Sequence, residues 1–229
     1  MEAPRLLLVD ADAVLCQTLA DYLRAHSFRV TVKHDGETGL QHASADAHDL
    51  VLLGDMPPGL NGGEVLRQIR RRGELPTVML CATHDAVEYI VYFELGADDC
   101  LAKSCNLREL VARLRSILRR SRQAGARYEL PNMDAAALSL SPAERTVTWR
   151  GMPLHLTGTE FELLEVLFSH AGAVSKADLA ASVLGRAMGK YDRSLEMHIS
   201  NLRKKLGRLA DGRSPIQTIR GAGYQLIGK

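Results

Sequence analysis

The sequence predicts an α/β domain built on a five-stranded parallel, doubly wound sheet, followed by a smaller domain of the winged helix-turn-helix class. Five short apolar runs alternate with five amphipathic segments in the first half of the chain. Three helical segments and a terminal hairpin pattern fill most of the second half. Strands that alternate with helices form a parallel sheet covered on both faces, and helices followed by a hairpin describe a winged helix.

The first half contains five strand and helix pairs. We expect strands at residues 6–9, 29–32, 50–53, 77–81 and 100–102, and helices at 13–25, 37–43, 63–71, 86–95 and 107–120. The apolar runs have strand length, and the segments between them carry apolar residues at helical spacing. In such a sheet, ligands bind beyond the carboxyl ends of the strands.

The helical pattern ends near residue 120 in a polar, glycine-containing stretch that is typical of a linker. We therefore predict domains at residues 1–120 and 135–229, joined by a linker at 121–134. In the second domain we expect strands at 137–140, 146–149 and 153–156, helices at 158–169, 176–183 and 193–206, and hairpin strands at 216–220 and 224–227.

Composition and charge narrow the class of protein. The 229 residues contain no apolar run of membrane-spanning length and no signal-peptide pattern, which predicts a cytoplasmic protein with no membrane partner. Residues 1–120 hold 14 Lys and Arg against 17 Asp and Glu, whereas residues 121–229 hold 15 against 10. A net charge of +5 on the second half indicates a polyanionic partner, because cations that neutralise phosphates release counterions.

The segment at 193–206 is the strongest candidate for a functional helix. Leu195, Ile199, Leu202 and Leu206 recur on one stripe that we expect to be buried. Its other faces offer cationic groups for phosphates and polar groups for base edges: Arg193, Ser200, Asn201, Arg203 and Lys204. Arg220, in the hairpin, is placed to reach a minor groove. An ordinary solvated basic helix is the alternative reading of this segment alone.

Three motifs in the second domain carry a specific resemblance: LTGTEFELL at 156–164, DRSLEMHISNLRKKL at 192–206 and TIRGAGY at 218–224. They resemble the winged-helix domain of OmpR/PhoB-type response regulators, and among these the CpxR-like branch. The resemblance implies a recognition helix at 193–206, a wing that includes Thr218 and Arg220, double-stranded DNA as partner, a homodimer on two half-sites, and contact with RNA polymerase. His198, Trp149 and Tyr224 are expected to be core residues.

The first domain resembles the receiver domain of the same family, a flavodoxin-like or CheY-like fold, through LLVDAD at 7–12, DLVLLGDMPPG at 49–59, VMLCA at 78–82 and GADDCLAK at 96–103. Receivers accept a phosphoryl group on a strand-end aspartate, and they need acids that hold Mg²⁺, a hydroxyl and a lysine. Asp10 and Lys103 stand at their expected positions. Ala11, Gly54 and Cys81 replace the second acid, the acceptor and the hydroxyl.

These replacements predict an atypical receiver without conventional phosphorylation, without catalytic residues or a bound metal, and with little affinity for Mg²⁺. A histidine kinase as partner stays open. One alternative is a displaced acceptor, because Asp55 and Asp12 each lie one residue beyond a lost acid. Another alternative is a protein that pairs with a normal receiver. A metabolic enzyme is disfavoured, since no phosphate loop, nucleophile elbow or histidine-rich metal motif occurs.

The remaining role of the first domain is dimerisation. The resemblance implies a symmetric face in which charge-pair positions are occupied by Asp98, Asp99, Glu109, Arg113 and Arg120. Ordinary solvated charges are the alternative.

The cysteines suggest a second hypothesis. Cys81, Cys100 and Cys105 belong to the region around Lys103, whose charge would lower the pKa of a thiol and favour redox sensing. The competing interpretation is that they are small buried hydrophobic residues. The four cysteines have no metal-ligand spacing, and a disulfide framework is not expected.

Overall fold

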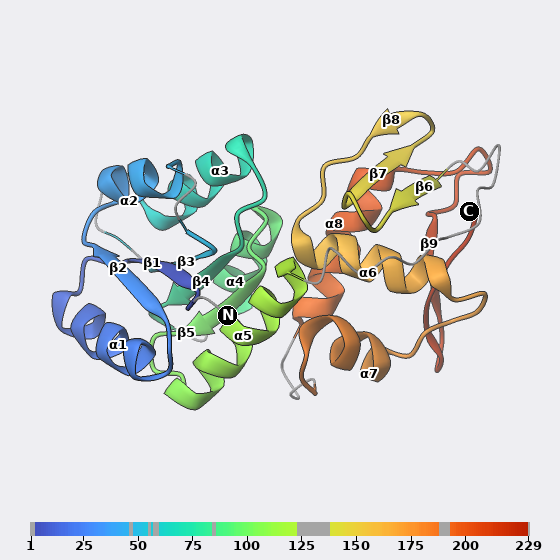
Figure 1. Ribbon diagram of the computed structural model, residues 1–229. Helices are drawn as coiled ribbons and strands as arrows, with labels where there is room; N and C mark the ends of the chain where they lie inside the picture. The colour runs from blue at the N-terminus through green and yellow to red at the C-terminus, as the bar shows by residue number, and fades with distance from the viewer. Residues whose placement is uncertain are drawn as a thin grey trace. The chain divides into compact units, whose positions relative to one another are not determined.

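The computed structural model describes residues 3–45, 48–54, 56, 60–83, 86–122, 138–187 and 193–228. The chain divides into two compact units, Met1–Leu118 and Arg119–Lys229 (Figure 1). Each unit has its own hydrophobic core. Most of the predicted linker at 121–134 lies outside the described residues. The exact domain limits therefore stay a prediction.

The first unit contains a five-stranded parallel sheet, as the sequence predicts. Its strands are β1 (Arg5–Val9), β2 (Arg29–Lys33), β3 (Leu50–Gly54), β4 (Thr77–Cys81) and β5 (Asp99–Ala102), in the spatial order β2-β1-β3-β4-β5. Strands β3 and β4 are buried along their whole length. This burial on both faces explains why they are continuous apolar runs rather than alternating ones.

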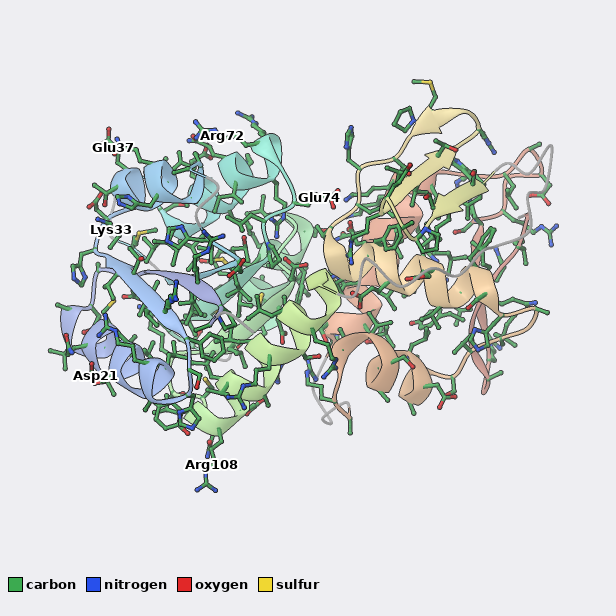
Figure 2. All side chains as sticks on the ribbon, viewed as in Figure 1. Asp21, Lys33, Glu37, Arg72, Glu74 and Arg108 are labelled. Atoms are coloured by element: carbon green, nitrogen blue, oxygen red, sulfur yellow. The ribbon has the colours of Figure 1, made fainter. Side chains whose placement is uncertain are left out.

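Helices cover both faces of this sheet (Figure 1). Helices α1 (Ala13–Ala25) and α5 (Leu107–Arg122) pack on one face, and α2 (Gly36–Ala43), α3 (Gly62–Arg72) and α4 (Ala86–Glu94) cover the other. Asp12, Asp35 and Asn61 cap α1, α2 and α3 by accepting a backbone N–H three residues later. Charged side chains such as Arg108 extend away from the unit (Figure 2).

The second unit has the expected winged helix-turn-helix order. A small antiparallel sheet is formed by β6 (Leu138–Ser141), β7 (Thr146–Trp149) and β8 (Met152–Pro153). Helices α6 (Gly158–Ser169), α7 (Lys176–Leu179), which continues as the π-helical turn η2 (Ala180–Leu184), and α8 (Ser194–Leu206) follow. The chain closes with the antiparallel hairpin of β9 (Ile216–Ile219) and β10 (Gly223–Leu226).

Strand β8 is shorter than the predicted strand at 153–156. Met152 and Pro153 pair with β7, and the backbone N–H of Leu154 donates to the Val147 carbonyl at 2.8 Å, but the strand itself ends at Pro153. Pro153 has no N–H to donate to a ladder, and the chain then leads to Thr157, whose side chain caps α6 in a reciprocal capping box with Glu160. The prediction was wrong here because the chain enters a helix cap where strand alternation was expected.

The buried stripe of α8 is confirmed. Leu195, Ile199, Leu202 and Leu206 are fully or almost fully buried, and so are His198, Trp149 and Tyr224, which were expected in the core. Within the described ranges, none of the helices is both long and apolar enough to cross a membrane.

Candidate functional site

Asp10 and Lys103 form an ion pair at the carboxyl edge of the parallel sheet. Asp10 follows β1 and is fully buried, and its Oδ2 lies 2.7 Å from the Nζ atom of Lys103. Its other oxygen, Oδ1, accepts the backbone N–H of Asp12 at 2.9 Å. Asp12 itself is exposed and serves as the N-cap of α1. The carboxylate of Asp10 is therefore held on both sides by residues of its own domain.

Gly54 ends β3, the strand next to β1, at the acceptor position. A Cβ atom on Gly54 would overlap Oδ2 of Asp10 and would lie 2.5 Å from its Cγ. Real Cβ atoms do not approach other heavy atoms this closely. The Asp10 carboxylate therefore occupies the space that an acceptor side chain would need. Asp55, the proposed substitute acceptor, lies outside the described residues.

The described residues at this edge do not fit Mg²⁺. A hard divalent cation needs several oxygen ligands, but the carboxylate of Asp10 is engaged by Lys103, and neither Ala11 nor Gly54 has a side-chain oxygen. Within the part of the chain that the structure describes, no three His, Cys, Asp or Glu side chains gather in a way that could hold a metal.

The cysteines near this edge are buried rather than presented to solvent. Cys81 ends β4, Cys100 lies in β5, and both are at most 4% exposed, whereas Cys105 is half-buried. Burial, together with a hydrogen bond to the Cys81 thiol, raises the pKa of Cys100 well above its usual value. Burial also raises the pKa of Cys105. Since the thiolate is the reactive form, this environment disfavours redox sensing, which stays a hypothesis.

Asp98 is turned into the first domain instead of toward a partner. Its Oδ2 accepts hydrogen bonds from the Arg70 guanidinium at 2.8 Å and from the backbone N–H of Thr77 at 2.9 Å, and the residue is 3% exposed. These contacts join α3, β4 and the start of β5. Because the partners of Asp98 lie on α3 and β4 rather than on α5, we leave Asp98 out of the interface proposed below.

Three other residues of the predicted dimer face form a connected cluster. Arg113 of α5 donates to Asp99 of β5 at 2.8 Å and to Glu109 of α5 at 2.9 Å. The pKa of Arg113 is raised. Burial opposes this shift, but the charge of Asp99 and the hydrogen bonds that Arg113 donates to both carboxylates outweigh it. The side chain of Arg120 lies outside what the structure describes.

The predicted DNA-contacting residues of α8 and its N-cap differ in exposure. Arg193 and Lys204 are exposed, and Ser200 and Arg203 are half-buried. Asn201 is only 6% exposed, because it shares a side of the helix with the buried residues Ser194 and His198, seven and three positions earlier. This burial does not favour a contact between Asn201 and a base edge, and the DNA-contacting role of Asn201 stays a prediction.

The hairpin presents an exposed tip. Thr218, Ile219 and Arg220 are all exposed, and Gly221, with φ at 74°, allows the tight turn that follows them. Sequence reasoning missed that Arg203 reaches this hairpin: its guanidinium donates to the Thr218 hydroxyl at 2.8 Å. The two residues are 15 positions apart, and no local pattern signals their pairing.

A receiver-type sheet followed by a winged helix with a basic recognition helix defines a two-domain transcription regulator. Comparison with known proteins agrees. Residues 6–115 match the family described as "Response regulator receiver domain", and residues 151–226 match "Transcriptional regulatory protein, C terminal".

Full-length relatives place the chain within a family. The transcriptional regulatory protein CpxR of Escherichia coli K12 is 42% identical over 228 residues, covering 97% of this chain and 98% of that protein. The transcriptional activator protein PfeR of Pseudomonas aeruginosa is 41% identical over 226 residues, covering 98% of this chain and 73% of PfeR. The chain belongs to the OmpR/PhoB-type response regulators, which are DNA-binding transcription factors and not enzymes.

Solved structures agree on the fold. The response regulator DrrB of Thermotoga maritima, an OmpR/PhoB homologue, has a TM-score of 0.52 at 26% identity over 98% of this chain and 99% of DrrB. A mutant form of the protein RitR has a TM-score of 0.78 at 23% identity over 99% of this chain and 100% of that chain.

Proposed function

We propose that this response regulator binds specific DNA sequences as a dimer without requiring aspartyl phosphorylation. The observation that carries the proposal is the occupied acceptor site. The Asp10 carboxylate, held by Lys103, fills the space beside Gly54 in which an acceptor side chain would stand. Because the lysine is already paired with an internal carboxylate, this edge of the receiver leaves no site at which a phosphoryl group would be bound.

The second domain supplies the DNA surface. We assign the recognition helix to α8, with Arg193, Ser200 and Lys204 on its accessible faces, and the minor-groove contact to Arg220 at the hairpin tip. The net charge of +5 on residues 121–229 supports a contact with phosphates. With double-stranded DNA as the partner, the protein acts in the cytoplasm, where RNA polymerase is the second partner. The proposal does not require phosphoryl transfer from a histidine kinase, and a histidine kinase as partner stays open.

The first domain supplies the dimer contact. The cluster of Asp99, Glu109 and Arg113 lies on β5 and α5, and the neighbouring helix α4 exposes two apolar side chains, Val87 at 67% and Val91 at 47%. Apolar area of this kind supplies affinity, while a surrounding charge cluster contributes orientation and specificity. We propose that the same face meets its copy across a twofold axis, with Arg120 adding a further charge.

Intact mass and gel-filtration size, measured before and after incubation with acetyl phosphate and Mg²⁺, test the proposal. We expect a dimer at the start and no added phosphoryl mass. A phosphoryl adduct that converts a monomer to a dimer, and that is missing from the Asp55→Ala variant, would show that Asp55 has replaced the lost acceptor. A stable monomer that binds no duplex selected from a random-sequence pool would reject the DNA-binding dimer itself.

A further inference from the structure

Arg203 of the recognition helix is directed at the wing. Its Nε donates to the backbone carbonyl of Ile216 at 2.9 Å, and one terminal nitrogen donates to the Thr218 hydroxyl at 2.8 Å. The carbon at the centre of the guanidinium lies 5.7 Å from the centroid of the Tyr224 ring, within the range of a cation–π contact. One half-buried side chain thus contacts both strands of the hairpin.

Two of these contacts, those with Thr218 and Tyr224, meet at a single rung of the hairpin. Thr218 of β9 lies directly opposite Tyr224 of β10 in the antiparallel register. Tyr224 is in turn paired with Val174 in the segment before α7. Arg203 therefore ties α8 to the rung at which the hairpin is anchored, two residues before Arg220 at its exposed tip.

The geometry requires arginine rather than any cation. A guanidinium is a planar group whose donors point in fixed directions, so it serves a carbonyl and a hydroxyl while its face covers an aromatic ring. A lysine ammonium carries the same charge on a single nitrogen and cannot make all three contacts. Lys204, the next residue, is exposed and offers a comparison of equal charge on the same helix.

We propose that Arg203 is a positioning residue that fixes the wing against the recognition helix, so that α8 and Arg220 reach two grooves of one DNA site in register. The inference rests on the proposed DNA-binding function and assigns a role within the same surface. Arg203 acts on DNA through the wing, in contrast to the direct contact with a base or a phosphate that its place in the helix suggested.

The decisive experiment compares Arg203→Lys with Arg203→Ala in the full chain. The probe is a duplex selected by the wild-type protein from a random-sequence pool, with an unselected duplex as control. A positioning role predicts that Arg203→Lys loses affinity for the selected duplex nearly as much as Arg203→Ala, by about ten-fold. A direct phosphate contact predicts instead that lysine retains the affinity, and that alanine lowers the salt slope by about one.

Two further comparisons sharpen the result. Thr218→Val removes the hydroxyl that Arg203 contacts, whereas Thr218→Ser keeps it, so only the valine variant should weaken binding through the loss of this contact. Arg220→Ala should cost less affinity when Arg203 is already alanine, because a displaced wing has little contact left to lose. Lys204→Ala should weaken both duplexes equally and lower the salt slope by about one.

Amide hydrogen exchange of β9 and β10, measured without DNA, tests the positioning role of Arg203 separately from the proposed DNA-binding function. Faster exchange in Arg203→Lys and in Thr218→Val, with Lys204→Ala unchanged, supports the positioning role even if no duplex is ever selected. Unchanged exchange together with full DNA affinity in Arg203→Lys overturns it and leaves the DNA-binding function intact. Failure of the wild-type chain to select any duplex overturns the proposed function.

Discussion

Replacing Gly54 with alanine tests whether the Asp10 carboxylate fills the acceptor site. A glycine to alanine change in an unstrained strand usually stabilises a protein by about 0.4–1 kcal/mol. Here the new Cβ would overlap Oδ2 of Asp10 and stand 2.5 Å from its Cγ and 2.9 Å from its Cβ. The carboxylate must therefore move and weaken its contact with Lys103.

We expect Gly54→Ala to lower the free energy of unfolding of the first unit by about 3 kcal/mol, since overpacking costs roughly 1–3 kcal/mol and a buried ion pair is weakened as well. For a unit of this size, that corresponds to a melting temperature lower by roughly 10 °C. Calorimetry of the full chain measures the loss. Trp149, the single tryptophan, lies in the second unit, and its fluorescence reports separately on that unit.

The background variant Asp10→Ala provides the critical comparison. Without the carboxylate, only the 2.9 Å approach to the Cβ atom of residue 10 remains. The cost of the alanine at position 54 should then fall below about 1 kcal/mol, which corresponds to a coupling of about 2 kcal/mol between the two sites. Gly73→Ala is a matched control, because nothing lies within 4 Å of a Cβ there, and it should change stability by less than about 0.5 kcal/mol. An equal cost of Gly54→Ala in both backgrounds would refute the reasoning.

Three further predictions concern stability and reactivity. Asp98→Asn should destabilise the first unit by about 3 kcal/mol in denaturant unfolding, because it leaves Arg70 without its anionic partner. Gel filtration should show the same oligomer as the wild-type protein, and a smaller oligomer would restore Asp98 to the interface. Burial raises the pKa of Cys105, so less thiolate forms at any given pH. Maleimide labelling followed by peptide mapping should show slow labelling of Cys105 at pH 8 that accelerates as the pH rises. A labelling rate at pH 8 equal to that of the unfolded chain would contradict this. Thr157→Ala should cost about 1 kcal/mol in thermal unfolding, because it removes the capping box with Glu160; Thr157→Ser should retain most of that stability.

The order and type of the elements could be predicted from the sequence, because burial on a sheet or a helix face leaves a periodic pattern. The buried run at β3 and the stripe from Leu195 to Leu206 are such cases, and both agree with the structure. The ends of elements that depend on a helix cap were harder to predict, as the short strand β8 shows. The replacement of the acceptor by Gly54 could also be predicted from the sequence, because the residue at a motif position can be identified without knowledge of the structure.

Tertiary structure alone decided what the changed residues do. Three contacts show this: the Asp10 carboxylate occupies the space beside Gly54, Asp98 pairs with Arg70, and Arg203 donates to Thr218. The residues in each contact are 15 to 44 positions apart. The burial of Asn201 likewise depends on which side of α8 meets the core. Local sequence determines which groups are present and which face of an element is apolar, whereas long-range packing determines which of those groups meet, because only the folded chain brings them within bonding distance.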